Sequence, residues 1–261
     1  MVTNAEIKNR ARETLGYKFA SSKWISGVLV TVIYLLISGV ISYASRFVQY
    51  LQIELLTDFV GLISSILSLF IIAPLGFGLY RFFLELGRGK NNNVGILFSE
   101  FQYGYWDSVS FQFTQGLYLS LWTMLFIIPG IIKTYSYSMA IYIKLDHPTM
   151  SANEAITESR RLMHGNKWRL FCLDLSFIGW HLLSILTLGI LQLWISPYVE
   201  AARVEFYLDL IGEKKEKDED GEEEPPVPFV DFVDEEVEEV KKMEEVEEVE
   251  NVEDVKDVND E

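Results

Sequence analysis

The first long apolar stretch of the chain runs from Trp24 to Ser45 and reads WISGVLVTVIYLLISGVISYAS. It holds no charged residue over about 22 positions, which at 1.5 Å per residue is enough to cross the roughly 30 Å of a bilayer's hydrocarbon core. A second uncharged stretch of similar length runs from Phe59 to Tyr80. Two such stretches predict transmembrane helices and indicate an integral membrane protein.

Two longer, largely apolar runs follow, from Val109 to Leu145 and from Leu170 to Leu210. Each has about 40 residues, twice the length that one membrane span needs. Near its middle the first run carries Pro129-Gly130, and the second carries the sequence Thr-Leu-Gly at 187–189. Because proline removes a helix donor and glycine adds backbone freedom, both positions suit a turn, so we interpret each run as a helical hairpin.

The predicted fold is therefore all-α, a polytopic transmembrane bundle of about six spans. Five spans is the competing interpretation, because the fourth segment is short and could be tilted or half inserted. The predicted organisation is a cytoplasmic amphipathic helix over 1–23, the transmembrane domain over 24–210 and an acidic tail over 211–261. The expected spans are 24–45, 59–81, 109–128, 131–146, 169–187 and 189–209.

The basic residues favour six spans with both termini in the cytoplasm. In this arrangement only Arg46 and Lys133 fall in outer loops, and the excess of basic residues on the inner side follows the positive-inside rule. The expected location is the cell membrane. The inner basic residues are Lys8, Arg10, Arg12, Lys18, Lys23, Arg81, Arg88, Lys90, Lys144, Arg160, Arg161, Lys167 and Arg169.

The net charge of −16 hides two different regions. From Glu213 onwards the chain holds 24 of its 38 acidic and 6 of its 22 basic residues, so residues 1–212 are weakly basic. Valines recur in this tail mostly every third position, which does not keep one helix face as a coiled coil requires. We expect a disordered tail. The alternative is that it docks on the inner basic residues.

Two capping boxes predict amphipathic helices outside the spans, Thr3-x-x-Glu6 and Ser151-x-x-Glu154. Both helices are expected to lie on the inner membrane surface, where basic side chains meet anionic lipid headgroups. They could anchor the spans or dock a membrane-protein partner. The interfacial basic residues of the second region are Arg160, Arg161 and Lys167.

Four ionisable residues lie at predicted membrane depth: Asp174, His181, Glu200 and Arg203. Charged groups in lipid are costly, so they normally face protein or water. One interpretation is a polar site or cation relay between the fifth and sixth spans. The other is structural: Asp174 lies near the inner interface and pairs with Arg169 or Lys167, and His181 is merely hydrogen-bonded.

The sequence contains no catalytic motif, which predicts a protein that is not an enzyme. Its single cysteine, Cys172, excludes disulfide pairing within the chain and a cysteine-based zinc site. Three scattered histidines do not form a metal set.

Basic residues are not interleaved with the aromatic cluster near Trp106, so we expect no nucleic-acid binding, and no cofactor is implied. Nothing in the sequence sets an oligomeric state.

The chain resembles the bacterial integral membrane proteins grouped as domain of unknown function 975. The resemblance rests on Asn4 to Arg12, on IIPGIIK at 127–133, and above all on EAI at 154–156 followed by SRRLMHGNK at 159–167. It extends through Ser176-Phe-Ile-Gly-Trp180 and Pro197-Tyr198 but not into the tail. It implies a multi-pass membrane protein, and it supplies no reaction or ligand.

Two functional hypotheses follow. The first is a non-enzymatic envelope scaffold that binds partners, suggested by the amphipathic helices, the tail and the lack of catalytic motifs. The alternative is a small transporter or channel-like subunit, suggested by the interrupted apolar runs and the ionisable groups within them.

Overall fold

A computed structural model describes residues 2–50, 54–90 and 93–213. Residues 1–211 form one compact unit, and the predicted acidic tail falls almost entirely outside the described residues. Every regular element in the described part is a helix, as predicted. The helices are α1 (Asn4–Leu15), α2 (Ser22–Tyr50), α3 (Glu54–Gly87), the 3-10 helix η1 (Val94–Phe98), α4 (Glu100–Tyr103), α5 (Tyr105–Leu125), α6 (Ile127–Tyr137), α7 (Ala140–Asp146), α8 (Ala152–Leu162), α9 (Lys167–Leu175), α10 (Ile178–Leu186) and α11 (Gln192–Leu210).

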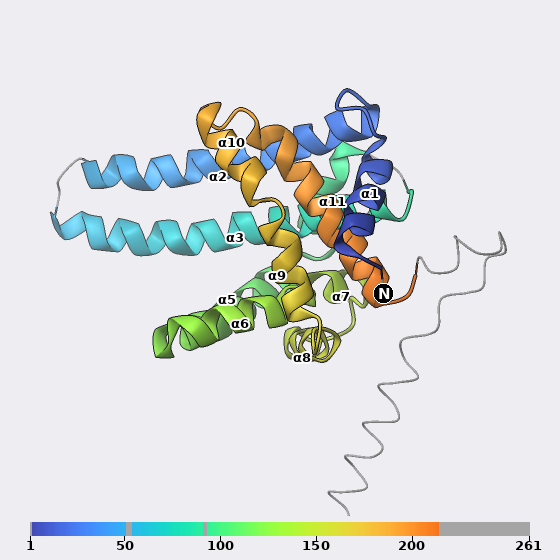
Figure 1. Ribbon diagram of the computed structural model, residues 1–261. Coiled ribbons are helices and arrows are strands. Elements are labelled where there is room, and N and C mark those ends of the chain that lie inside the picture. The colour runs from blue at the N-terminus through green and yellow to red at the C-terminus, as the bar shows by residue number, and fades with distance from the viewer. Residues whose placement is uncertain (1, 51–53, 91–92, 214–261) are drawn as a thin grey trace, which may run out of the picture. The chain divides into compact units, whose positions relative to one another are not determined.

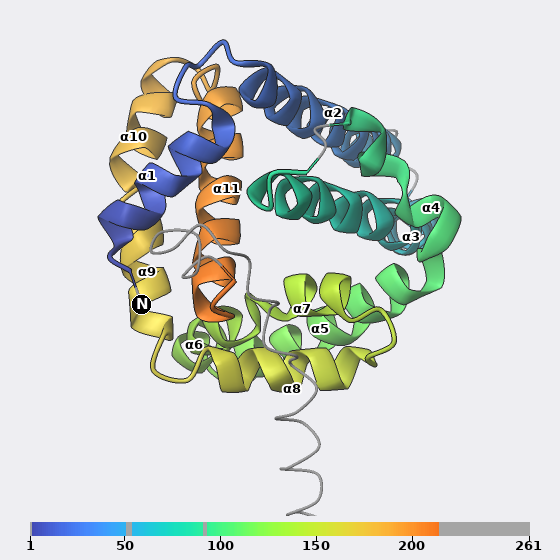
Figure 2. The ribbon, with the colours of Figure 1, turned by 90° about the vertical axis from the view of Figure 1, so that its right-hand side faces the viewer.

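Helices α2 and α3 form a long hairpin, and α5 and α6 form a shorter one that projects toward the same side (Figure 1). Helix α11 packs across α1, α2 and α3 at the opposite end of this unit. Viewed from that end, α1 lies over α11, and α8 lies beside the base of the second hairpin (Figure 2). The tightly packed core lies at this end, where Phe82, Phe83, Tyr142, Phe206 and Tyr207 are almost fully buried.

The expectation of six spans is wrong for the described residues. Three segments are long and apolar enough to cross a membrane: Ser22–Tyr43, Ser68–Gly87 and Lys167–Leu186, the last of which comprises α9 and α10. Helix α6 has 11 residues, about 16 Å, which is half of the hydrocarbon thickness. The two long apolar runs, from Val109 to Leu145 and from Leu170 to Leu210, each had enough residues for two membrane spans. In the structure, however, their backbone is interrupted and forms several shorter helices.

The predicted turn at Pro129-Gly130 is also wrong in position. The chain reverses at Phe126, whose backbone is extended. Pro129 and Gly130 both lie in the first turn of α6. Proline is tolerated there because the first helical N–H groups have no intrahelical partner. Gly130 instead lets the two helices approach, since an added Cβ would collide with Thr123 of α5.

The second predicted turn is correctly placed. Helix α10 ends at Leu186, and Leu188 and Gly189 have φ of 53° and 85°. This left-handed conformation is what a glycine accommodates at a helix end. The side chains around this turn, including Leu186 and Leu188, are strongly exposed.

Both amphipathic helices form, and each packs its apolar face against other helices of the body. In α1, Ile7, Ala11 and Leu15 are fully buried, and the helix packs against α11. In α8, Ala155 and Ile156 are buried where the helix contacts α5, α6 and α7. Sequence periodicity identified an apolar face in each case, but only the tertiary structure assigned protein rather than lipid as its neighbour.

Candidate functional site

A cavity of about 460 Å³ lies among α3, α5, α6, α7, α9 and α11. One part of its wall is apolar and includes Leu119, Ile131 and Leu170. Another part is polar, with the carboxamides of Gln112 and Gln115. Three tyrosines, Tyr80, Tyr135 and Tyr142, also line the cavity, as do the charged residues Asp174 and Arg203.

The charged groups come from two helices. Arg203 of α11 donates from Nη2 to both carboxylate oxygens of Asp174 on α9, at 3.3 and 3.4 Å. Its Nη1 lies 3.9 Å from Oε1 of Glu200, one turn earlier on α11. A single guanidinium therefore stands between two carboxylates at the cavity wall.

Part of the hydrogen-bonding capacity near the cavity is unused. Glu200 Oε2, Arg203 Nε and the Tyr142 hydroxyl are buried and make no hydrogen bond with the described residues. Buried polar atoms are normally paired, and leaving one unsatisfied costs about 1–3 kcal/mol. Of these three residues, Arg203 and Tyr142 line the cavity, so their unused groups could form hydrogen bonds with a bound molecule.

His181, the fourth predicted site residue, belongs elsewhere. Its Nδ1 lies 3.0 Å from Oε1 of Gln192 and it does not line the cavity. Their seven-residue spacing would put Asp174 and His181 near one face of a continuous helix. The chain breaks between α9 and α10 at residues 176–177, so the seven-residue spacing does not keep them on one face.

The expected structural partner of Asp174 was also wrong. Arg169 does not pair with Asp174: it bonds Asp209 Oδ2 at 2.6 Å and the carbonyl of Val2 at 2.6 Å. Asp174 pairs instead with a residue 29 positions away. Helical spacing finds partners within one helix, but a partner on another helix depends on how the helices pack.

The interfacial basic residues differ in their surroundings. Arg161 forms an ion pair with Glu158 at 2.6 Å, whereas the side chain of Arg160 is exposed on α8. Lys167 is half-buried at the start of α9. Their contact with lipid headgroups stays a prediction.

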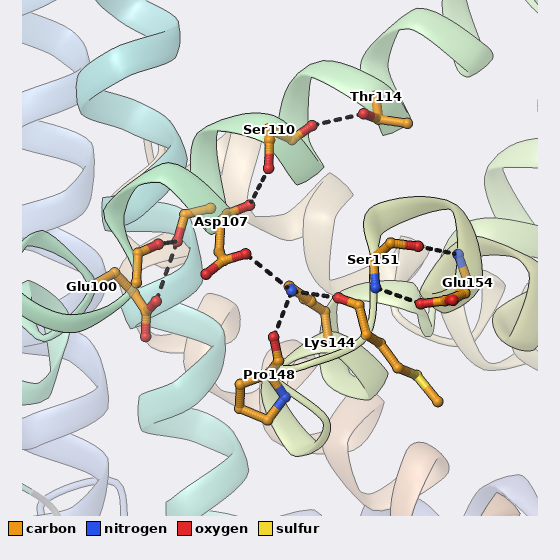
Figure 3. A network of polar contacts seen from close by, with 11 residues as sticks. Glu100, Asp107, Ser110, Thr114, Lys144, Pro148, Ser151 and Glu154 are labelled. Atoms are coloured by element: carbon orange, nitrogen blue, oxygen red, sulfur yellow. Dashed lines mark hydrogen bonds and ion pairs between the residues drawn. The ribbon is translucent and has the colours of Figure 1, made fainter.

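A polar network fixes the helices that frame the cavity (Figure 3). The buried ammonium of Lys144 on α7 bonds Asp107 of α5 at 3.2 Å and the carbonyl oxygens of Pro148 and Met150 at 2.8 and 2.5 Å. The loop that holds these carbonyls leads directly into the capping box of α8, where Ser151 and Glu154 bond each other reciprocally. One side chain thus ties α5, α7 and α8 together.

Sequence reasoning missed several residues of the cavity wall. Gln112 and Gln115 are three residues apart in an otherwise apolar run, so they share a helix face and could have been recognised as polar groups at membrane depth. Tyr80 and Tyr142 carry no such signal. They come from helices far apart in the sequence, and only tertiary packing brings them to one cavity.

Residues 125–214 match the family described as "Protein of unknown function (DUF975)". The match includes α6 to α11 and thus both charged residues of the cavity, Asp174 and Arg203. It confirms the resemblance inferred from the sequence over this part of the chain. No curated protein and no solved structure matches the chain.

Proposed function

We propose that this chain, whose residues 125–214 carry the pattern of the family of unknown function 975, is an integral membrane protein that binds a small organic cation in its polar cavity. The single observation that carries this proposal is the placement of the Asp174–Arg203 ion pair at one cavity in a largely apolar body, with Glu200 3.9 Å from the same guanidinium. A protonated amine is the class of solute that fits best.

The exposed surface supports residence in a membrane. Besides the three long apolar segments, large apolar side chains are exposed along α2, α5, α6 and α10. Met124 and Leu188, at the tips of two helical hairpins, are 90% and 94% exposed. An apolar surface of this extent suits lipid, whereas in water it would drive association.

The contacts between the two ends of the body support termini on one side. The backbone N–H of Val2 donates to Asp209 Oδ1 at 3.2 Å, and Arg169 at the start of α9 bonds both residues. The chain therefore leaves this point and returns to it. The positive-inside rule favours the cytoplasm for this side, and we propose the cell membrane as the location.

The charges of the cavity favour a cation. Arg203 balances one of the two carboxyl groups of Asp174 and Glu200, so ionisation of the second leaves a net negative charge beside the cavity, and charges interact strongly where the surroundings exclude water. Tyrosine rings attract cations over their faces. An ammonium group in the cavity could bond the unused hydroxyl oxygen of Tyr142 and lie near the three tyrosines.

The size and lining favour an organic cation over a metal ion. About 460 Å³ lies within the usual range of small-molecule sites. Within the residues that the structure describes, no cluster of three or more His, Cys, Asp or Glu side chains could hold a metal ion. The apolar wall of Leu119, Ile131 and Leu170 would contact the hydrocarbon part of the solute.

The scaffold hypothesis and the absence of enzymatic activity stay predictions. The amphipathic helices that motivated the scaffold hypothesis bury their apolar faces within the body, so these faces do not supply a docking surface. The cavity is the feature that favours solute binding, and a protein of this kind could serve as a transporter subunit.

Solute-induced stabilisation of the full chain in lipid nanodiscs tests the proposal. A ligand that binds only the folded state raises the unfolding temperature in a saturable way. The probes are choline, ethanolamine, putrescine and, as the opposite charge, acetate. The test variant is Asp174→Asn, and the matched control is Glu13→Gln, which removes a carboxylate from the exposed side of α1.

We expect at least one amine to stabilise the wild-type chain and Asp174→Asn to weaken its apparent affinity by roughly tenfold, as loss of one charged hydrogen bond implies. Glu13→Gln should bind as the wild type does. Stabilisation by acetate alone, or equal amine binding by both variants, would contradict the proposed cation site.

A further inference from the structure

A second cavity of about 370 Å³ lies where α1, the start of α2, α10 and the start of α11 meet. It shares no lining residue with the polar cavity that contains Asp174 and Arg203. Three tryptophans line it, Trp24, Trp180 and Trp194, together with one cation, Arg12. This combination of aromatic walls and a single positive charge has no role in the function proposed above.

The floor of this aromatic cavity is rigid. Trp24 is 2% exposed, and its indole N–H donates to the carbonyl of Trp194 at 3.3 Å. Its ring lies 4.7 Å from that of Phe19 and 6.1 Å from that of Tyr198. Three segments of the chain, the loop after α1, the start of α2 and α11, therefore hold these aromatic rings together.

The cation is positioned at the cavity with its charge available. The guanidinium of Arg12 lies 5.4 Å over the ring of Tyr198, and its side chain is exposed. Within the described residues it makes no ion pair with a carboxylate. Arg12 also fixes the next turn, because its carbonyl accepts from the N–H of Tyr17 at 2.8 Å.

The rim is apolar and open. Tyr17 and Phe19 are 67% and 61% exposed, and Trp180 and Trp194 are also partly exposed. Tryptophan and tyrosine favour the level of the lipid headgroups, where one end of the ring meets hydrocarbon and the other meets water. In a chain that spans a membrane through α2, this cavity lies at the first turn of that span.

We infer that the aromatic cavity is a binding site for an anionic phospholipid, with the phosphate on Arg12 and the acyl chain along Trp180, Leu191 and Trp194. A guanidinium binds phosphate through paired N–H groups, and the aromatic and aliphatic walls suit a hydrocarbon chain. A cationic ligand is disfavoured, because Arg12 would repel it. Lys18 and Lys23, on the segment that supplies Tyr17 and Phe19, add positive charge nearby in sequence.

Quenching of tryptophan fluorescence by lipids with brominated acyl chains tests this inference on the full chain in mixed micelles. Brominated phosphatidylglycerol is the anionic probe and brominated phosphatidylcholine the zwitterionic one. The variant is Arg12→Gln, and the matched control is Arg10→Gln on the same helix, a residue that does not line the cavity. Inorganic phosphate is added as a competitor in a separate series.

We expect the anionic lipid to quench the wild-type chain at about fivefold lower concentration than the zwitterionic one, the factor that one basic side chain near an anionic surface supplies. Arg12→Gln should remove this preference and Arg10→Gln should keep it. Equal quenching by both lipids, loss of preference in both variants, or displacement of the lipid by millimolar inorganic phosphate would each overturn the inference.

A second variant guards against misfolding of Arg12→Gln. Trp180→Phe keeps the cation and an aromatic ring in the wall but removes one fluorescent indole, so it should lower the amplitude of quenching by the anionic lipid while largely keeping its concentration dependence. An unchanged amplitude would mean that the lipid binds away from Trp180 and would also overturn the inference.

Discussion

The ammonium of Lys144 shows how a single residue decides local structure in this protein. It is buried, yet it is satisfied by one carboxylate and two backbone carbonyl oxygens. Buried lysines are tolerated when they are paired and hydrogen-bonded in this way. The sequence marked Lys144 only as one of many inner basic residues, so its role became visible from its neighbours.

We predict that Lys144→Met destabilises the folded protein by about 1–3 kcal/mol for each carbonyl left without a donor. The measurement is the free energy of unfolding in detergent, and the control is Lys18→Met, which removes the same charge from an exposed position. If both variants unfold alike, the bonds to Pro148 and Met150 do not stabilise the loop.

Pairs of elements in this molecule depend on close backbone approach as much as on apolar area. The hairpin of α5 and α6 packs tightly because Gly130 lies against Thr123, and α3 meets α11 closely where Gly87 lies against Val204. A side chain larger than hydrogen at either glycine must displace its neighbour. Length and hydropathy in the sequence do not report such contacts.

Gly130→Ala should therefore destabilise the hairpin by about 1–3 kcal/mol through overpacking. Adding Thr123→Ala should recover part of this loss, because it removes the methyl group, which is the atom nearest to the new Cβ. Gly116→Ala is the control: no atom lies within 4 Å of its added Cβ, so it should be neutral or slightly stabilising. Thermal unfolding of the three variants and the wild type tests this contact, and absence of recovery in the double variant would contradict it.

The capping box of α8 gives this element a pH dependence. The N–H of Ser151 donates to Glu154 Oε2 at 2.6 Å, and this bond lowers the pKa of Glu154 below its usual value of 4.5. Because the pKa is lower in the folded than in the unfolded state, the stabilisation is present above pH 4.5 and is lost as the pH falls through the folded pKa.

We expect Glu154→Gln to have a lower unfolding temperature than the wild type at neutral pH. In acid, the difference between the two unfolding temperatures should become smaller. Measuring both proteins over the same pH series cancels the titration of the other carboxylates. A difference between them that stays constant from neutral pH to well below pH 4.5 would show that the ionised carboxylate does not contribute.

At the scale of the whole molecule, the described residues divide into a densely packed end and an apolar end. Charged pairs such as Arg88 with Asp146 and Arg169 with Asp209 lie at the packed end, where α3, α7, α9 and α11 meet. Exposed apolar side chains lie along α2 and at the two hairpin tips. This separation suits a protein that is partly embedded in lipid and partly outside it.

The short hairpin of α5 and α6 should enter the membrane without crossing it. A cysteine introduced at Phe126, in a Cys172→Ala background, should resist membrane-impermeant maleimide added from outside the cell, because about 16 Å of α6 cannot span the bilayer. A cysteine at Arg46, near the end of α2, is the control and should react. Rapid labelling at position 126 would favour a hairpin that spans.

The sequence by itself determined the chemical class of this protein: helices, an apolar body, a weakly basic charge on that body and an acidic tail. Those properties follow from composition and periodicity, which act locally along the chain. The tertiary structure decided which residues contact one another. It buried the apolar faces of α1 and α8 in protein, broke the helix between Asp174 and His181, and brought Arg203 to Asp174. The physical reason is that a side chain's partner on another helix depends on helix ends and packing, which residue spacing within one helix does not encode.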